Sequence, residues 1–155
     1  MGQAQAEAES TLLTPQSSLK PLQRLQALTS KPRILLVEDD YFNQSIFSFL
    51  LEESGVLFDI ANDGAEAVAK AATNHYALIL MDVQMPILNG LDATRAIRQT
   101  AAYQTTPIIA ISANAFDEDR RNCFEAGMNA FLVKPVTAER LYAELECWLV
   151  HPADN

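Results

Sequence analysis

Short apolar runs alternate with stretches of helical periodicity along most of this chain. Five such runs predict β-strands, at Ile34–Val37, Phe58–Ala61, Ala77–Met81, Ile108–Ile111 and Ala130–Val133. After each run, apolar residues recur every three or four positions, as at Phe47, Leu50 and Leu51, which predicts an amphipathic helix. The fourth of these helices is expected over Ala115–Ala126.

The predicted strands do not alternate between apolar and polar residues, which is typical of strands buried on both faces of a parallel sheet. The helices between them allow right-handed crossovers. Five strand–helix units therefore predict an α/β fold, a flavodoxin-like (βα)5 three-layer sandwich with a parallel five-stranded sheet. The strand order 2-1-3-4-5 is taken by analogy with known folds of this type.

The pattern divides the chain into a domain at 33–150 and two tails, at 1–32 and 151–155. The first tail is rich in Ala, Gln, Ser and Thr and reads as a flexible tail or interdomain linker. Leucines at every third position from Leu19 to Leu28 leave a short amphipathic helix open as an alternative. A flexible connector is favoured over this helix because Pro21 interrupts the segment.

Charge and composition narrow the possible functions. The 155 residues carry a formal charge of −9, and the first 32 hold two acidic and three basic residues, so the rest carries −10. Such a domain repels phosphate backbones, which disfavours direct binding of nucleic acid. No apolar run reaches the ~20 residues that span a bilayer, and the start does not resemble a secretion signal. A soluble, cytoplasmic protein without membrane contact is expected, either a monomer or a weak dimer.

Charged and hydroxyl residues gather where the predicted strands end. Glu38, Asp39 and Asp40 follow the first strand and Asp82 follows the third. Ser112 follows the fourth strand, and Lys134–Pro135 follows the fifth. Ligands of doubly wound sheets bind at the carboxyl ends of the strands, so these side chains are expected to share one pocket.

Several carboxylates in one pocket repel one another, and a hard divalent cation relieves the repulsion. The sequence therefore predicts a Mg²⁺ site with Asp39 and Asp82 as direct ligands. Glu38 is expected to act through water, and a backbone carbonyl near Gln84 could complete the protein ligands.

An aspartate carboxylate can attack phosphorus and form an aspartyl phosphate. That reaction depends on in-line positioning and charge neutralisation. Asp82 is the predicted nucleophile. Lys134 would neutralise charge opposite the metal, and Ser112 would donate a hydrogen bond to a phosphoryl oxygen.

Four segments in this order resemble response-regulator receiver domains: Ile-Leu-Leu-Val-Glu38-Asp39, Leu-Ile-Leu-Met-Asp82-Val-Gln-Met-Pro86, Ile-Ile-Ala-Ile-Ser112-Ala and Phe-Leu-Val-Lys134-Pro135. The stretch from Val37 to Gln44 looks most like receivers of hybrid sensor histidine kinases. The resemblance covers about residues 33–150. It implies a two-component phosphorelay protein whose phosphodonor is a phosphohistidine on a histidine kinase or a histidine phosphotransfer domain.

The resemblance also implies roles for two further residues. Phe131 stands at the position of the family's switch aromatic, and Pro135 is a candidate for a cis peptide bond. A phosphoryl group adds roughly −1.5 to −2 charge. Ser112 would move toward it and Phe131 would rotate into the vacated space, in a two-state switch. Such a domain signals and is not an enzyme in the usual sense, although it could catalyse its own phosphorylation and dephosphorylation.

Three other functions compete with this interpretation. A phosphatase or phosphotransferase with an aspartate nucleophile generally needs a second acid two residues later, where this chain has Gln84. A flavin-binding protein of the same fold would need a Ser/Thr/Gly-rich phosphate loop after the first strand, where this chain has three acids. A degenerate receiver used only for docking would not need the intact set of site residues.

Overall fold

The computed structural model describes residues 20–150, in which five strands and six α-helices follow one another in the predicted alternation. The strands are β1 (Arg33–Val37), β2 (Leu57–Ala61), β3 (Leu78–Asp82), β4 (Ile108–Ser112) and β5 (Ala130–Val133). The helices are α2 (Pro21–Gln26), α3 (Tyr41–Ser54), α4 (Gly64–Thr73), α5 (Gly90–Arg98), α6 (Asp117–Ala126) and α7 (Ala138–Leu149), with a 3₁₀ turn η1 (Ala101–Tyr103) after α5.

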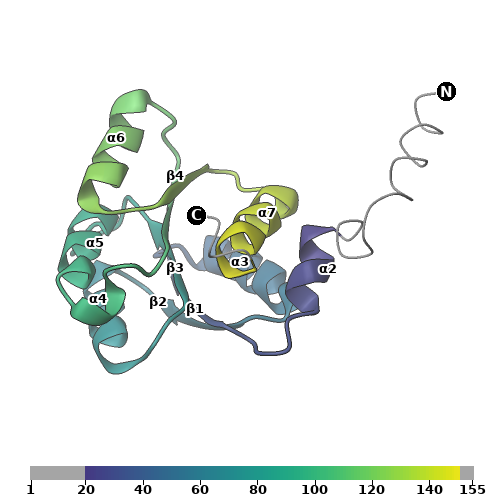
Figure 1. Ribbon diagram of the computed structural model, residues 1–155. Coiled ribbons are helices and arrows are strands. Elements are labelled where there is room, and N and C mark those ends of the chain that lie inside the picture. The colour runs from purple at the N-terminus through teal and green to yellow at the C-terminus, as the bar shows by residue number, and fades with distance from the viewer. Residues whose placement is uncertain (1–19, 151–155) are drawn as a thin grey trace.

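All neighbouring strands pair in parallel, in the order β2-β1-β3-β4-β5. Helices α4, α5 and α6 cover one face of the sheet, and α3 and α7 cover the other (Figure 1). The predicted fold class and strand order are therefore confirmed. The carboxyl ends of β1, β3, β4 and β5 lie along one edge, and this arrangement positions the site.

Two cores fill the space between these layers, one on each face of the sheet. Alternate residues of each strand contribute to opposite cores, so Leu35 and Val37 of β1 face α4–α6, whereas Leu36 faces α3 and α7. β3 and β4 are buried along their whole length. Burial on both faces explains why the strand sequences are continuously apolar.

The segment before β1 is more ordered than the sequence indicated. A flexible connector was favoured, but Pro21 opens helix α2 at its first position, where a missing N–H costs nothing. Leu25 is fully buried, and the Arg24 guanidinium lies 2.6 Å from the carboxylate of Glu146 on α7. The preference for a flexible connector was thus wrong for residues 21–26, which pack beside α7 and α3 (Figure 1). The predicted boundary at residue 33 remains a prediction, and residues 1–19 and 151–155 lie outside the described part.

Side-chain caps define where most of the long helices begin. The side chains of Asp40, Asp63, Asn89 and Thr137 accept hydrogen bonds from backbone N–H groups in the first turns of α3, α4, α5 and α7. The N-cap of α6 is Phe116, whose side chain makes no such bond. α6 also begins two residues later than the predicted Ala115, because Phe116 adopts an extended conformation.

Candidate functional site

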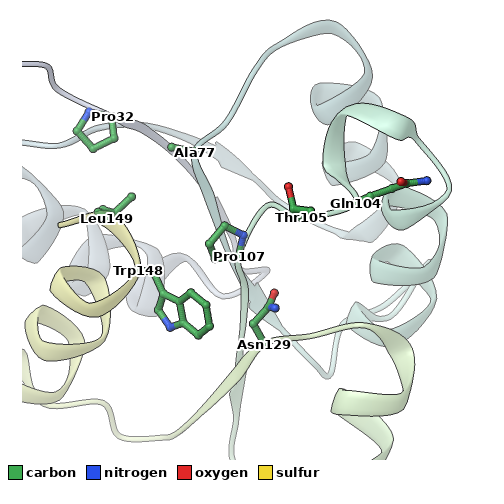
Figure 2. Close-up of a pocket in the computed structure, with 8 residues that line it drawn as sticks. All are labelled: Pro32, Ala77, Gln104, Thr105, Pro107, Asn129, Trp148 and Leu149. Carbon is green, nitrogen blue, oxygen red and sulfur yellow. The ribbon is translucent and has the colours of Figure 1, made fainter. Parts of the chain in front are cut away.

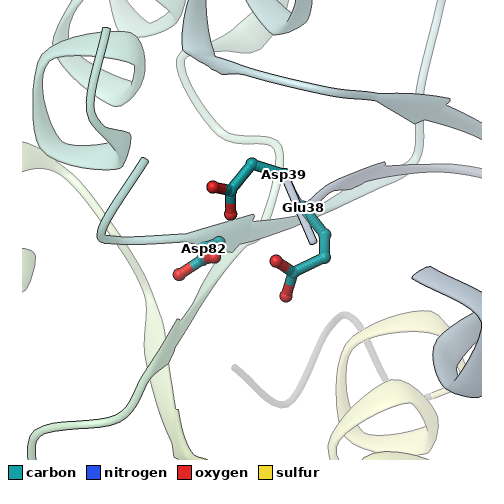
Figure 3. A group of neighbouring side chains, drawn as sticks. All are labelled: Glu38, Asp39 and Asp82. Carbon is teal, nitrogen blue, oxygen red and sulfur yellow. The ribbon is translucent and has the colours of Figure 1, made fainter. Parts of the chain in front are cut away.

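Three carboxylates meet at the carboxyl ends of β1 and β3. Glu38 and Asp39 directly follow β1, and Asp82 is the last residue of β3. Each offers an oxygen atom, and these oxygens lie within 4.8 Å of one another (Figure 3). Glu38 is fully buried and Asp82 is 3% exposed, whereas Asp39 faces solvent. The structure therefore brings together the three acids that the sequence proposed as metal ligands.

Lys134 lies between the two buried carboxylates. Its Nζ is 3.2 Å from Asp82 Oδ2 and 3.1 Å from Glu38 Oε1. The first contact is a hydrogen bond, but the second lacks hydrogen-bond geometry, so Glu38 Oε1 is buried with an ion-pair neighbour and no hydrogen-bond donor. The Lys134–Pro135 peptide bond is cis. The ammonium group therefore sits where it can offset negative charge on Asp82.

Backbone groups hold the remaining carboxylate oxygens in place. The Gln84 N–H donates to Asp82 Oδ1 at 3.2 Å, and the Asp40 N–H donates to Glu38 Oε2 at 3.1 Å. Gly90 lets the loop after β3 return closely, since a Cβ at that position would lie 2.2 Å from the Asp82 carbonyl oxygen. These contacts leave Asp82 oriented by one N–H and one ammonium group.

The charges perturb each other's ionisation. The pKa of Glu38 is raised to about 7, chiefly by burial; the hydrogen bond from the Asp40 N–H opposes the shift and the nearby charge of Asp82 adds to it. Burial alone would lower the pKa of Lys134, but the negative charges of Asp82 and Glu38 outweigh it and the pKa is raised. Lys134 is therefore held as a cation, while Glu38 titrates near neutral pH.

Ser112 and Phe131 lie on the neighbouring strands. Ser112 ends β4, is 2% exposed, and its Oγ accepts a hydrogen bond from the Asn114 N–H at 3.1 Å. Phe131 on β5 is 6% exposed, so its ring is buried in this structure. Gln84 adjoins Asp82 through its N–H, and the role of its carbonyl as a ligand remains a prediction.

Gln44 supports the site and was not identified from the sequence. It is 8% exposed on the inward face of α3, and its Nε2 donates to the Glu38 carbonyl at 2.6 Å and to Asn62 Oδ1 at 2.7 Å. This amide ties the loop after β1 to the loop after β2. The available signal was a polar residue on the same helix face as Phe47 and Leu51.

A different cavity lies at the opposite, amino-terminal edge of the sheet (Figure 2). It measures about 720 Å³, and Pro32, Ala77, Pro107 and Asn129, which line it, each immediately precede a strand. None of the lining residues that belong to the described part, 20–150, is charged. It is larger than the 250 Å³ cavity beside Lys134, but the acidic cluster does not line it.

Comparison with known proteins identifies the family. The response regulator receiver domain family matches residues 34–146. The chain belongs to this family. Hybrid signal transduction histidine kinase B of Dictyostelium discoideum is 40% identical over 124 residues, a match that covers 73% of this chain and 6% of that protein. The sensor histidine kinase RcsC of Escherichia coli is 38% identical over 117 residues, covering 72% of this chain and 12% of that protein. The chain thus spans a small part of the curated relatives it matches.

Solved receiver structures share the fold. The receiver domain of a sensor histidine kinase from Pseudomonas aeruginosa is 41% identical, with a TM-score of 0.73 over 77% of this chain and 98% of that one. It contains a magnesium ion coordinated in its active-site cleft. A chemotaxis response regulator of Vibrio cholerae is 30% identical, with a TM-score of 0.74 over 77% of this chain and 100% of that one. This chain is a two-component receiver domain similar to those of hybrid histidine kinases, and a degenerate receiver is not favoured.

Among residues 20–150, no helix is both long and apolar enough to cross a bilayer.

Proposed function

We propose that Asp82 accepts a phosphoryl group from a phosphohistidine and that the phosphorylated domain signals through a change of conformation. The observation that carries the proposal is the buried Asp82 carboxylate, held 3.2 Å from the Lys134 ammonium within a cluster of three acids. Buried acids clustered around a cation are candidates for functional sites.

The donor set of the pocket fits magnesium. Glu38, Asp39 and Asp82 supply only oxygen atoms, and Glu38 Oε1 is buried without a hydrogen-bond donor. Asp39, Asp82 and the Gln84 carbonyl would hold Mg²⁺, with Glu38 acting through water. When bound, the ion would supply positive charge to phosphoryl oxygens.

The chain's own residues account for the rest of the transfer. An Asp82 oxygen forms the new P–O bond while the P–N bond of the phosphohistidine breaks, and the imidazole leaves with the electron pair of that bond. Lys134 offsets the charge that accumulates on the phosphoryl oxygens, and the Ser112 hydroxyl donates a hydrogen bond to one of them. We assign hydrolysis of the aspartyl phosphate to the same pocket, with Gln84 and Asn114 at its rim.

We further propose that the exposed face of α3 receives the phosphodonor. Tyr41, Phe42 and Phe49 on this helix are 81%, 70% and 65% exposed, and Ile46 is 42% exposed. Exposed apolar patches of this kind mark interaction sites. The helix starts at Tyr41, two residues after Asp39 of the acidic cluster, so a histidine kinase or phosphotransfer domain docked there would bring its phosphohistidine toward Asp82. A cytoplasmic location and a monomer or weak dimer complete the proposal.

Intact mass after incubation with acetyl phosphate tests the phosphoacceptor role. The 155-residue chain should gain one phosphoryl group with Mg²⁺ and none with excess chelator. A chain that gains no phosphoryl group under either condition, or gains it equally under both, would contradict the proposal.

A further inference from the structure

The first turn of α6 is capped differently from the first turns of the other long helices. Its N-cap Phe116 provides no side-chain hydrogen bond and is 72% exposed. The Phe116 carbonyl accepts a hydrogen bond from the Arg120 N–H, at 3.1 Å. Three consecutive acids, Asp117–Asp119, fill the turn between them. Arg120 is the last residue of this turn, and its side chain reaches β5.

Arg120 lies over the ring of Phe131. The guanidinium carbon is 4.8 Å from the ring centroid, within the range of a cation–π interaction. Arg120 itself is exposed, whereas the ring beneath it is only 6% exposed. Within residues 20–150, no carboxylate oxygen lies within salt-bridge distance of this guanidinium, although Asp117 stands three residues earlier. The side chain covers the aromatic ring and does not form a local ion pair.

The register of the sheet connects this contact to Ser112. Phe131 pairs with Ala110, and Ser112 pairs with Val133. Residues two apart in a strand face the same side, so Ser112 and Phe131 project from the same face of adjacent strands. Ser112 also begins the loop that leads into α6. The hydroxyl and the ring thus lie on one face of neighbouring strands, and the guanidinium over the ring belongs to the first turn of α6.

We propose that Arg120 is a positioning residue that holds the Phe131 ring in its buried position and fastens the first turn of α6 to β5. Through the shared face of β4 and β5, this contact favours the conformation that receives a phosphoryl group at Asp82. The inference rests on the proposed function, because it concerns how the same pocket communicates with α6. A cation–π contact at an exposed site changes a conformational equilibrium by about two- to fivefold.

Comparison of Arg120→Gln with Arg121→Gln tests this role in the full 155-residue chain. Both substitutions remove one positive charge from the exposed surface of α6, but only the first removes the contact with Phe131. Solvent exposure of the Phe131 ring is measured by NMR, as the relaxation that a soluble paramagnetic agent causes at the ring protons. The apparent dissociation constant of beryllofluoride, used as a phosphate mimic with Mg²⁺, is measured on the same variants.

We expect the exposed population of the ring to rise about two- to fivefold in Arg120→Gln, and the dissociation constant of the mimic to rise by up to the same factor. Arg120→Lys should show smaller changes, since it keeps a cation, and Arg121→Gln should behave as wild type. Equal ring exposure in the two glutamine variants would overturn the proposal, as would greater ring exposure with an unchanged affinity for the mimic. Failure of the wild-type chain to bind the mimic would instead contradict the proposed function, and this inference would fall with it.

Discussion

The two ends of the sheet differ in what surrounds them. At the carboxyl end, three carboxylates and an ammonium group from the ends of β1, β3 and β5 lie together, and Ser112 ends the neighbouring strand β4. At the amino end, residues that precede the same strands line a larger cavity, and its lining within residues 20–150 has no charged side chain (Figure 2). Both ends are built by the same strands, so strand geometry alone does not make a site. The proposed site therefore rests on convergent charge and not on the size of a cavity.

The largest expected effect is at the carboxyl end. Asp82→Asn removes the nucleophilic carboxylate with little change of shape, so phosphorylation by acetyl phosphate should be abolished. Asp92→Asn, which removes an exposed acid on α5, should be phosphorylated as wild type. Intact mass with Mg²⁺ measures both. Comparable phosphoryl transfer to Asp82→Asn would remove this end of the sheet from the mechanism.

Loss of the Lys134 ammonium group should have the next largest effect on phosphorylation. Lys134→Ala removes the ammonium group 3.2 Å from Asp82 Oδ2, and loss of one such group slows a charged transfer by about 10²–10³-fold. Lys70→Ala, on the exposed side of α4, serves as the control. Initial rates of phosphorylation measure the effect. A slowing of less than threefold would show that Lys134 is not used.

Ionisation of Glu38 should make magnesium binding depend on pH. Burial raises the pKa of Glu38 to about 7, and a cation favours the ionised form. Affinity for Mg²⁺ should therefore rise about tenfold between roughly pH 6 and pH 8. In the metal-free protein, the folded state favours protonated Glu38. Its contribution to stability is complete at pH values below the ordinary pKa of a glutamate, and it is lost as the pH rises through the folded-state pKa of about 7.

Calorimetric titration of Mg²⁺ at both pH values measures this dependence. In Glu38→Gln, which cannot ionise, the rise between the two pH values should disappear. An equal rise in wild type and Glu38→Gln would assign the titration to another group.

The smallest effect is expected from a substitution at the amino end of the sheet. Asn129 Oδ1 accepts hydrogen bonds from the Ile108 N–H and from Arg98, so Asn129→Ala should lower the free energy of unfolding by about 1 kcal/mol. Thermal unfolding measures this change. The rate of phosphorylation well below the melting temperature should not change. A rate lowered as much as in Lys134→Ala would contradict the contrast between the two ends.

The sequence predicted the parts of this molecule that follow from the arrangement of strands. Glu38, Asp82, Ser112 and Lys134 each end or follow an apolar run, and parallel strands bring their carboxyl ends to one edge. The strand order itself came from analogy, since periodicity does not determine which strands are neighbours.

Contacts between segments far apart in the chain could not be predicted from the sequence. Packing of Leu25 beside α7 depends on a groove that forms only in the folded state, so Pro21 was read as an interruption although it begins a helix. The two hydrogen bonds of Gln44 and the position of Arg120 over Phe131 likewise depend on side-chain directions that no local pattern specifies.

Chemical trapping of the phosphorylated residue tests the central claim most directly. Borohydride reduces an acyl phosphate to an alcohol, so an aspartyl phosphate at position 82 becomes homoserine, which peptide mass mapping locates. After incubation with acetyl phosphate and Mg²⁺, we predict homoserine at position 82 and none when the metal is chelated. Homoserine at Asp39 in place of Asp82, or a phosphorylated chain that yields no homoserine, would contradict the account.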